Sequence, residues 1–211
     1  MNDIFWFLSE IDSNRLRRAR ELSEIKVRMN DLSTLAQFGI QSKAVIVLSY
    51  AHWEGFYNDC ISLYIDYLRE AGKSVSDVSW PMLIGLLQSD FQRLRDRRHS
   101  RSATVEFVLR FQQTVENGFS GFDKEVVSSR SNLDFKKLKE NFEVMRFDYS
   151  PFLRWRLKID NELVRWRHSV AHGDDPDLST VDINEHIAFT QDMLLILSDR
   201  FQSEIMNSAE N

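Results

Sequence analysis

An arginine and a histidine, Arg167 and His172, lie five residues apart near the end of a predicted helix, in the segment 159–174. A histidine titrates near neutrality and can take or give a proton. An arginine stays charged and binds phosphate oxygens through two parallel hydrogen bonds. Together the two side chains can activate a ribose 2′-hydroxyl and stabilise the developing phosphorane. The pair therefore predicts metal-independent cleavage of RNA, which leaves a 2′,3′-cyclic phosphate and spares DNA, because DNA lacks the 2′-hydroxyl.

The spacing of the pair limits how the two side chains can meet. Five residues turn a helix by roughly 500°, which leaves Arg167 and His172 about 140° apart around its axis. Gly173 follows directly, and glycine is favoured just past a helix end. We therefore expect the helix to fray before Gly173, so that His172 swings back toward the long arginine side chain. The structural alternative is a helix cap in which Arg167 pairs with an acid such as Asp174.

The histidines of this segment do not predict a metal centre. His168 and His172 with Asp174 lack a convincing closed set of ligands. Cys60 is the one cysteine of the chain, which excludes an intrachain disulfide and a thiolate metal cage. We expect neither a metal nor a cofactor.

Five arginines lie close together in a short polar stretch that follows a predicted helix. They are Arg93, Arg95, Arg97, Arg98 and Arg101. The chain has a formal net charge of -5 and a pI near 5.6, so its overall charge gives no attraction to nucleic acid. A local basic patch would supply that attraction, and these arginines are the candidate RNA-binding residues. The usual alternative for such a cluster is a solvated charge run.

The elements that must position these residues are helices. Apolar residues make up 43% of the 211 residues, whereas Gly (7) and Pro (3) are scarce, which disfavours a β protein rich in tight turns. Apolar side chains recur at spacings of three and four along most of the chain. The sequence therefore predicts an all-α bundle that forms a single domain over residues 1–211.

Several helix ends can be placed from the residue types that favour them. A long first helix is expected from about Ile4, and a second from about residue 41 to 70, just before Gly72. The second helix is apolar nearly all round, as is typical of the buried centre of a bundle, yet it contains His52 and Glu54. Further helices are expected near 81–94, 105–115, 133–145, 151–173 and from 183 onward. Residues 93–101 and 116–131 are predicted loops.

Three segments of the chain resemble a known family. Arg167-His-Ser-Val-Ala-His-Gly173 resembles the motif of the HEPN superfamily. In that motif an arginine is followed by a polar residue, then by three to five further residues, and then by a histidine. His168 falls where that family accepts Asn, Asp or His. Tyr50-Ala-His-Trp-Glu-Gly-Phe56 is similar to a block from one branch of small bacterial stand-alone HEPN proteins. The likeness continues through Asn132-Leu-Asp-Phe135 and 159–173, and it covers most of the chain.

The resemblance implies an up-and-down bundle with four core helices and additional helices, and a homodimer in which two copies of the motif face a shared cleft. Arg167 would bind phosphate, His172 would act as general acid and base, and His168 would orient the site. Glu54 would hold Arg167 or complete the cleft, unless it forms a satisfied buried pair with His52. No tyrosine follows His172 closely, so the Arg-His-Tyr variant of nucleotidyl-modified HEPN toxins is not matched.

These features predict an RNA endonuclease of HEPN type, a toxin or antiphage effector that a cognate antitoxin or sister HEPN protein restrains. The first alternative is a non-catalytic HEPN protein that binds RNA or acts as an immunity module, and the second is a structural helical adaptor. The intact Arg-His pair favours catalysis. The chain start lacks the features of a signal peptide, and the longest apolar run, residues 44–48, is too short to cross a bilayer. We therefore expect a cytoplasmic protein without a membrane partner.

Overall fold

The computed structural model describes residues 3–30, 39–97, 100–116, 118–130, 132–174, 176, 178 and 182–210. Over these residues the chain forms helices and turns without a strand, which confirms the predicted all-α class. The α-helices are α1 (Ile4–Asn30), α2 (Ile40–Glu70), α3 (Leu83–Asp96), α4 (Arg101–Glu116), α5 (Phe135–Met145), α6 (Ser150–Leu153), α7 (Arg156–Lys158), α8 (Trp166–Ala171) and α9 (Ile183–Glu210). Shorter elements are the 3-10 helices η2 (Trp80–Met82) and η3 (Lys124–Val126) and the π-helix η4 (Ile159–Arg165). Among the described helices, none has the length and apolar character that crossing a bilayer requires.

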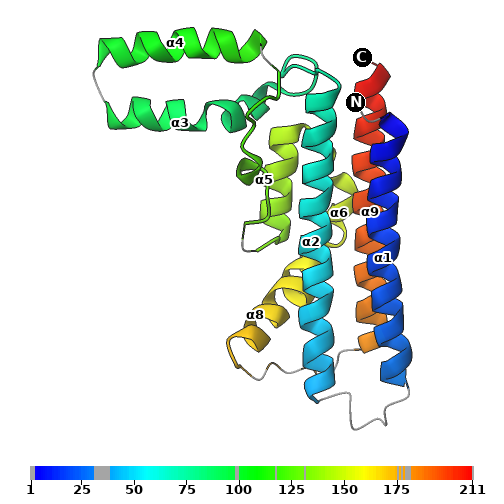
Figure 1. Cartoon of the computed structure of the whole chain (residues 1–211). Helices are drawn as coiled ribbons and strands as arrows, with labels where there is room; N and C mark the ends of the chain where they lie inside the picture. Colours follow the sequence, from blue (N-terminus) through cyan, green and yellow to red (C-terminus); the bar gives the residue numbers. More distant parts are fainter. Residues whose placement is uncertain are drawn as a thin grey trace.

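Three long helices, α1, α2 and α9, form the body of the molecule and lie side by side (Figure 1). α2 begins one residue before its predicted start and ends where predicted, at Glu70. Its central residues Trp53, Phe56 and Tyr57 have no exposed surface. The reason is that α1, α9, η3, η4 and α8 all contact this helix and cover it from several sides. The predicted position of this helix at the centre of the bundle is therefore confirmed.

Phe201 of α9 joins the core of the bundle to α5. The side chain is fully buried, and its ring makes T-shaped contacts at centroid distances of 5.2 to 6.2 Å with Tyr57, Tyr64, Phe142 and Phe147. Edge-to-face pairs of this kind add stability beyond the burial of their apolar area. Because these rings come from α2, α5 and the turn after α5, they fix α5 against the long helices.

Residues 151–173 do not form the single helix that the sequence predicts. The segment is divided into α6, α7, the π-helix η4 and α8. Two carboxylates in η4 have partners on different elements: Asp160 accepts a hydrogen bond from the Phe135 N–H at 2.8 Å, and Glu162 lies 3.4 Å from the buried His186 of α9. Such tertiary contacts override the local preference for a regular α-helix. π-helical turns are rare and are frequent at functional sites.

α3 and α4 form a helical hairpin that projects from the bundle (Figure 1). The loop predicted at 93–101 is therefore wrong in its first part, because α3 continues through Asp96. Side-chain pairs three residues apart support this last turn: Asp90 with Arg93 at 3.6 Å and Gln92 with Arg95 at 2.7 Å. α4 begins at Arg101, and Arg98 lies outside the described residues.

The segment 118–130, which falls within the loop predicted at 116–131, contains turns and η3. Its backbone groups need partners from elsewhere, because the segment has no regular helical ladder. Asn141 of α5 is 1% exposed, and its amide nitrogen lies 2.8 Å from the Val127 carbonyl and 3.0 Å from the Ser128 carbonyl. A buried amide therefore fixes the end of this segment against α5.

Candidate active site

The chain between η3 and α5 is held in place by side chains of α2. The Tyr50 hydroxyl accepts a hydrogen bond from the Leu133 N–H at 2.9 Å, and the Trp53 indole donates one to the Leu133 carbonyl at 3.0 Å. Further along α2, Asn58 exchanges two hydrogen bonds with Ser129, at 2.8 and 3.0 Å. These contacts satisfy backbone groups of Ser129 and Leu133 that have no helical partner, and they fix both residues against α2.

Arg167 at the start of α8 lies against this fixed segment. Its Nη2 donates a hydrogen bond to the Asn132 side-chain oxygen at 3.0 Å, and its guanidinium carbon lies 3.9 Å from the centre of the Tyr50 ring. A guanidinium over an aromatic face is attracted by the quadrupole of the ring. The half-buried cation is therefore held by α2 on one side and by the chain before α5 on the other.

Glu54 lies one turn along α2 from Tyr50 and interacts with the tyrosine hydroxyl. Burial raises the pKa of Tyr50 to about 12; the charge of Glu54 adds to the effect, and the hydrogen bonds with Leu133 and Arg167 oppose it. Tyr50 is consequently a neutral phenol at physiological pH. One carboxylate oxygen of Glu54 is buried without a hydrogen-bond partner among the described residues. Glu54 thus brings to Tyr50 and Arg167 a carboxylate oxygen that can still accept a hydrogen bond.

His168 lies on α8 and His172 caps the helix, and both side chains are exposed. They are four residues apart, which places them one above the other on a helix, and their ring centroids are separated by 4.2 Å. The planes of the two rings are inclined by 51°. Two imidazoles therefore lie together at the surface, and the first of them directly follows Arg167 in the chain.

The end of α8 is closed rather than frayed, which overturns the expectation for this helix end. Gly173 has a φ of +82°, and the N–H of Asp174 donates to the Ser169 carbonyl at 2.9 Å. Together with the Gly173 N–H bond to the Val170 carbonyl at 3.1 Å, these contacts form a Schellman motif, in which a left-handed residue satisfies the last helical carbonyls. His172 is the capping residue of this motif, so its backbone position is set by the helix end.

The predicted site residues of α8 and its cap form two groups. Arg167 contacts Tyr50 and Asn132, whereas His168 and His172 contact each other. Glu54 joins the first group through Tyr50.

The buried pair of His52 with Glu54 is not formed. His52 faces α1, where its Nε2 lies 3.6 Å from a carboxylate oxygen of Glu21.

Of the arginines predicted as an RNA-binding cluster, Arg93, Arg95, Arg97 and Arg101 lie on the helical hairpin, at the other end of α2 from α8 (Figure 1). Arg93 and Arg97 each lie 3.6 Å from a carboxylate, of Asp90 and Glu106 respectively. Arg95 instead lines a groove between α3 and α5. Arg93 and Arg97 thus have acidic neighbours, whereas Arg95 faces the groove.

Tyr50 and Asn132 hold Arg167, yet the sequence predicts neither as a site residue. Asn132 is 35 positions from Arg167, and an isolated asparagine or tyrosine carries no recognisable chemistry. Both residues fall in segments that resemble HEPN blocks, and this is the signal by which they could be found. In the described part of the chain, no three His, Cys, Asp or Glu side chains form a group that could hold a metal ion.

A family model described as RiboL-PSP-HEPN matches residues 13–203 of the chain. The matched range includes α2, the segment before α5 and all of α8, and therefore every contact of the Arg167 cluster. Comparisons with curated proteins and with solved structures give no match. Because the family model covers nearly the whole chain, the protein belongs to the RiboL-PSP-HEPN family of the HEPN superfamily.

Proposed function

We propose that this protein is a metal-independent RNA endonuclease whose site is formed by Arg167, His168 and His172. The observation that carries the proposal is the presence, on the short helix α8 and its cap, of a guanidinium held by Asn132 and Tyr50 and of two exposed imidazoles whose ring centroids are 4.2 Å apart. A fixed cation stabilises developing negative charge without reorganising during the reaction. Membership of a family of RNA-cleaving domains supports RNA as the substrate.

The reaction is a transesterification within the RNA strand. The ribose 2′-oxygen attacks the neighbouring phosphorus while His172 takes the 2′-hydroxyl proton as general base. The bond from phosphorus to the 5′-oxygen of the next nucleotide breaks, and that oxygen receives a proton from an imidazolium. Arg167 binds the non-bridging oxygens and stabilises the charge of the pentacoordinate phosphorus. The products are a 2′,3′-cyclic phosphate and a 5′-hydroxyl.

His168 and Glu54 have supporting roles in this proposal. His168 orients the imidazole of His172, whose ring centroid lies 4.2 Å from its own. Glu54 keeps the tyrosine hydroxyl engaged, so that the face of the Tyr50 ring stays beneath Arg167. The arginines of the hairpin, Arg93 to Arg101, supply the positive charge that attracts RNA to a chain of negative net charge.

The proposed active species is a homodimer. One arginine and two histidines make a sparse site, and a two-fold interface doubles each of them in a shared cleft. The biological role that fits such an enzyme is a toxin or antiphage effector, restrained by a cognate antitoxin or a sister HEPN protein. A protein that sediments as a monomer at micromolar concentration while cutting RNA at full rate would rule out the shared cleft.

The test of the activity is incubation of the purified protein with tRNA and total RNA in excess EDTA, beside the His172→Ala variant. Cleavage by the parent alone, with fragments that end in 2′,3′-cyclic phosphate, is the expected result. Loss of cleavage in EDTA that returns with Mg²⁺ would refute metal independence. If a folded parent cuts no RNA but binds RNA or a sister HEPN protein, the chain is the non-catalytic binding or immunity module instead.

A further inference from the structure

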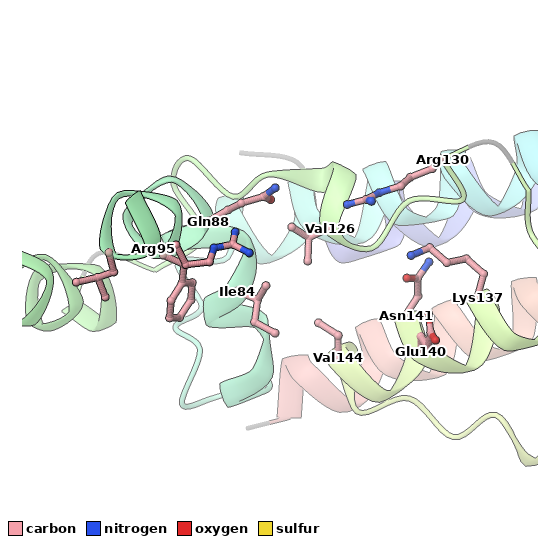
Figure 2. A pocket seen from close by; sticks show the side chains of 11 residues that line it. Ile84, Gln88, Arg95, Val126, Arg130, Lys137, Glu140, Asn141 and Val144 are labelled. Carbon is pink, nitrogen blue, oxygen red and sulfur yellow. The ribbon is translucent and has the colours of Figure 1, made fainter. Parts of the chain in front are cut away.

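A groove of about 870 Å³ lies between α3 and α5, with the segment 118–130 as its third wall (Figure 2). Its volume is in the range of pockets that take small ligands or single units of a polymer. Apolar side chains from all three elements line it: Ile84, Phe91, Leu94, Val126 and Val144. Figure 2 shows Arg95 at one end of the groove and Arg130 with Lys137 at the other. The groove therefore combines an apolar lining with positive charge at both ends.

The charge of these three cations is available to a ligand. The guanidinium of Arg95 donates to the neutral side chain of Gln92 at 2.7 Å, and no carboxylate in the described part of the chain forms an ion pair with Arg95, Arg130 or Lys137. Glu140 also lines the groove, and the ammonium of a lysine outside the groove lies 3.9 Å from its carboxylate. The groove thus favours an anionic ligand that has an apolar or aromatic part.

Arg130 connects the groove to the proposed active site. It has a φ of +56°, which is uncommon for a residue other than glycine, and its Nε donates to the Glu125 carbonyl at 3.4 Å. Strained backbone of this kind persists only where surrounding contacts hold it, and it concentrates at functional sites. Asn132, the partner of Arg167, is two residues after Arg130. The Cα atoms of Arg130 and Asn132 are therefore at most about 7 Å apart.

We propose that the groove binds a single-stranded segment of the RNA substrate, next to the phosphate that is cleaved. Phosphates contact Arg95, Arg130 and Lys137, and a base rests on the apolar lining at Phe91. The inference builds on the proposed function, because it places the strand that leads to Arg167.

The lining favours a single strand over a duplex. In a duplex the bases are stacked on one another, so only phosphates and sugars reach a protein surface of this kind. Unpaired bases can stack on aromatic side chains, and a groove that combines cations with an aromatic ring is typical of single-strand binding. Phe91 is 38% exposed and contributes to the lining, which leaves its ring accessible.

Binding is measured separately from cleavage by using the full chain with His172→Ala, which keeps the RNA intact. The groove variant adds Arg95→Gln and Lys137→Gln. Its matched control adds Arg110→Gln and Lys139→Gln, which lie on the hairpin and on α5 and remove the same charge outside the groove. Fluorescence anisotropy with a short, unstructured oligoribonucleotide gives the affinity at several salt concentrations, and circular dichroism confirms the helical content of each variant.

We expect the groove variant to bind at least about tenfold more weakly, because each cation loses a charge-assisted hydrogen bond to phosphate. Its salt slope falls by about 1.4, that is, about 0.7 for each lost phosphate contact to a single strand. The control binds within about twofold of the parent, since it retains the groove cations. Equal losses in groove variant and control, no loss in the groove variant, or no binding by the parent would each overturn the proposal.

The Phe91→Leu variant tests the contact with a base. Leucine keeps the apolar packing of α3 against Phe107, whose ring lies 5.3 Å away, but removes the aromatic face. We expect about a five- to tenfold loss of affinity for the single strand and none for a duplex of the same sequence, from the usual size of base stacking on aromatic residues. Equal effects on both RNAs would refute a base in the groove. Failure of the parent to cut RNA in EDTA would end the endonuclease proposal but would leave this binding result intact.

Discussion

At the scale of single residues, the contacts of Arg167 depend on the planar shape of its guanidinium as well as on its charge. The guanidinium lies over the Tyr50 ring, with its carbon 3.9 Å from the ring centre, and one of its nitrogens donates a hydrogen bond to Asn132. A lysine at this position keeps the charge but loses the planar contact with the ring and the two parallel bonds to phosphate. A positive charge alone therefore cannot replace Arg167.

We expect Arg167→Lys to lower kcat/KM for RNA cleavage by about 10²–10³-fold, the usual cost of losing one preorganised charge donor in an active site. The measurement is initial rates on a single RNA substrate in EDTA. Arg165→Lys is the matched control, because Arg165 is exposed on the preceding turn, and it should retain the parent rate. Parent-like cleavage by Arg167→Lys would show that position 167 supplies only a charge.

The two histidines are predicted to differ although their rings are in contact. His172→Ala removes the group that transfers the proton and should cost about 10²–10⁴-fold in kcat. His168→Asn keeps a polar side chain with donor and acceptor atoms beside His172, and cleavage should stay within about tenfold of the parent. Single-turnover rates with enzyme in excess separate this effect from RNA binding. If both variants lose the same large factor, His168 transfers a proton itself.

At the scale of elements, the cap of α8 should affect function more than stability. Gly173 and Gly72 both follow helix ends, with φ of +82° and +65°, and at each an added Cβ meets nothing within 4 Å. Alanine therefore costs only the left-handed backbone conformation, about 1–2 kcal/mol at either position. Since the Schellman motif after α8 also sets the position of His172, only Gly173→Ala should slow RNA cleavage.

Unfolding in urea and initial cleavage rates test this pair of glycine variants. Similar losses of unfolding free energy with slower cleavage in Gly173→Ala alone are the expected results. Unchanged cleavage by Gly173→Ala would mean that the cap does not position the imidazole.

Helix bounds that depend on neighbouring residues in the chain could be predicted from the sequence. Helix bounds that depend on contacts with distant residues could not. The bounds of α2 follow from its nearly continuous apolar surface and from Gly72, which are both visible along the chain. The division of 151–173 depends on Asp160 and Glu162, whose partners are on α5 and α9. A regular apolar spacing indicates which face of a helix is buried, but it does not show which neighbour a carboxylate contacts.

The same distinction applies to the candidate site. Arg167, His168 and His172 are close in sequence and carry recognisable chemistry, so the motif reveals them. Asn132 is joined to Arg167 only through the fold, because side chains of α2 hold the chain beside it. The frayed end expected for α8 is wrong for a related reason: the spacing of two side chains suggested mobility, whereas the glycine that follows them closes the helix.

At the scale of the whole molecule, the contact between α1 and α2 contains a buried histidine. His52 is 8% exposed, and its Nδ1 has no hydrogen-bond partner among the described residues. Burial lowers its pKa below the ordinary value of 6.5; Glu21 opposes the shift, and the charges of Arg18 and Arg17 add to it. All three charged neighbours belong to α1, so the protonation state of one imidazole on α2 depends on how the two helices pack.

Because the pKa of His52 is lower in the folded state, the unfolded chain binds this proton more readily as the pH falls below 6.5. The associated stability is complete above that pH and is lost as the pH falls toward the lowered folded value, by at most about 1.4 kcal/mol per pH unit. His52→Gln should remove this part of the pH dependence. Urea unfolding of parent and variant between pH 7.5 and 5 measures the difference in slope, with His172→Gln, an exposed histidine, as control. Parallel slopes for parent and His52→Gln would show that the imidazole does not couple the packing of α1 and α2 to pH.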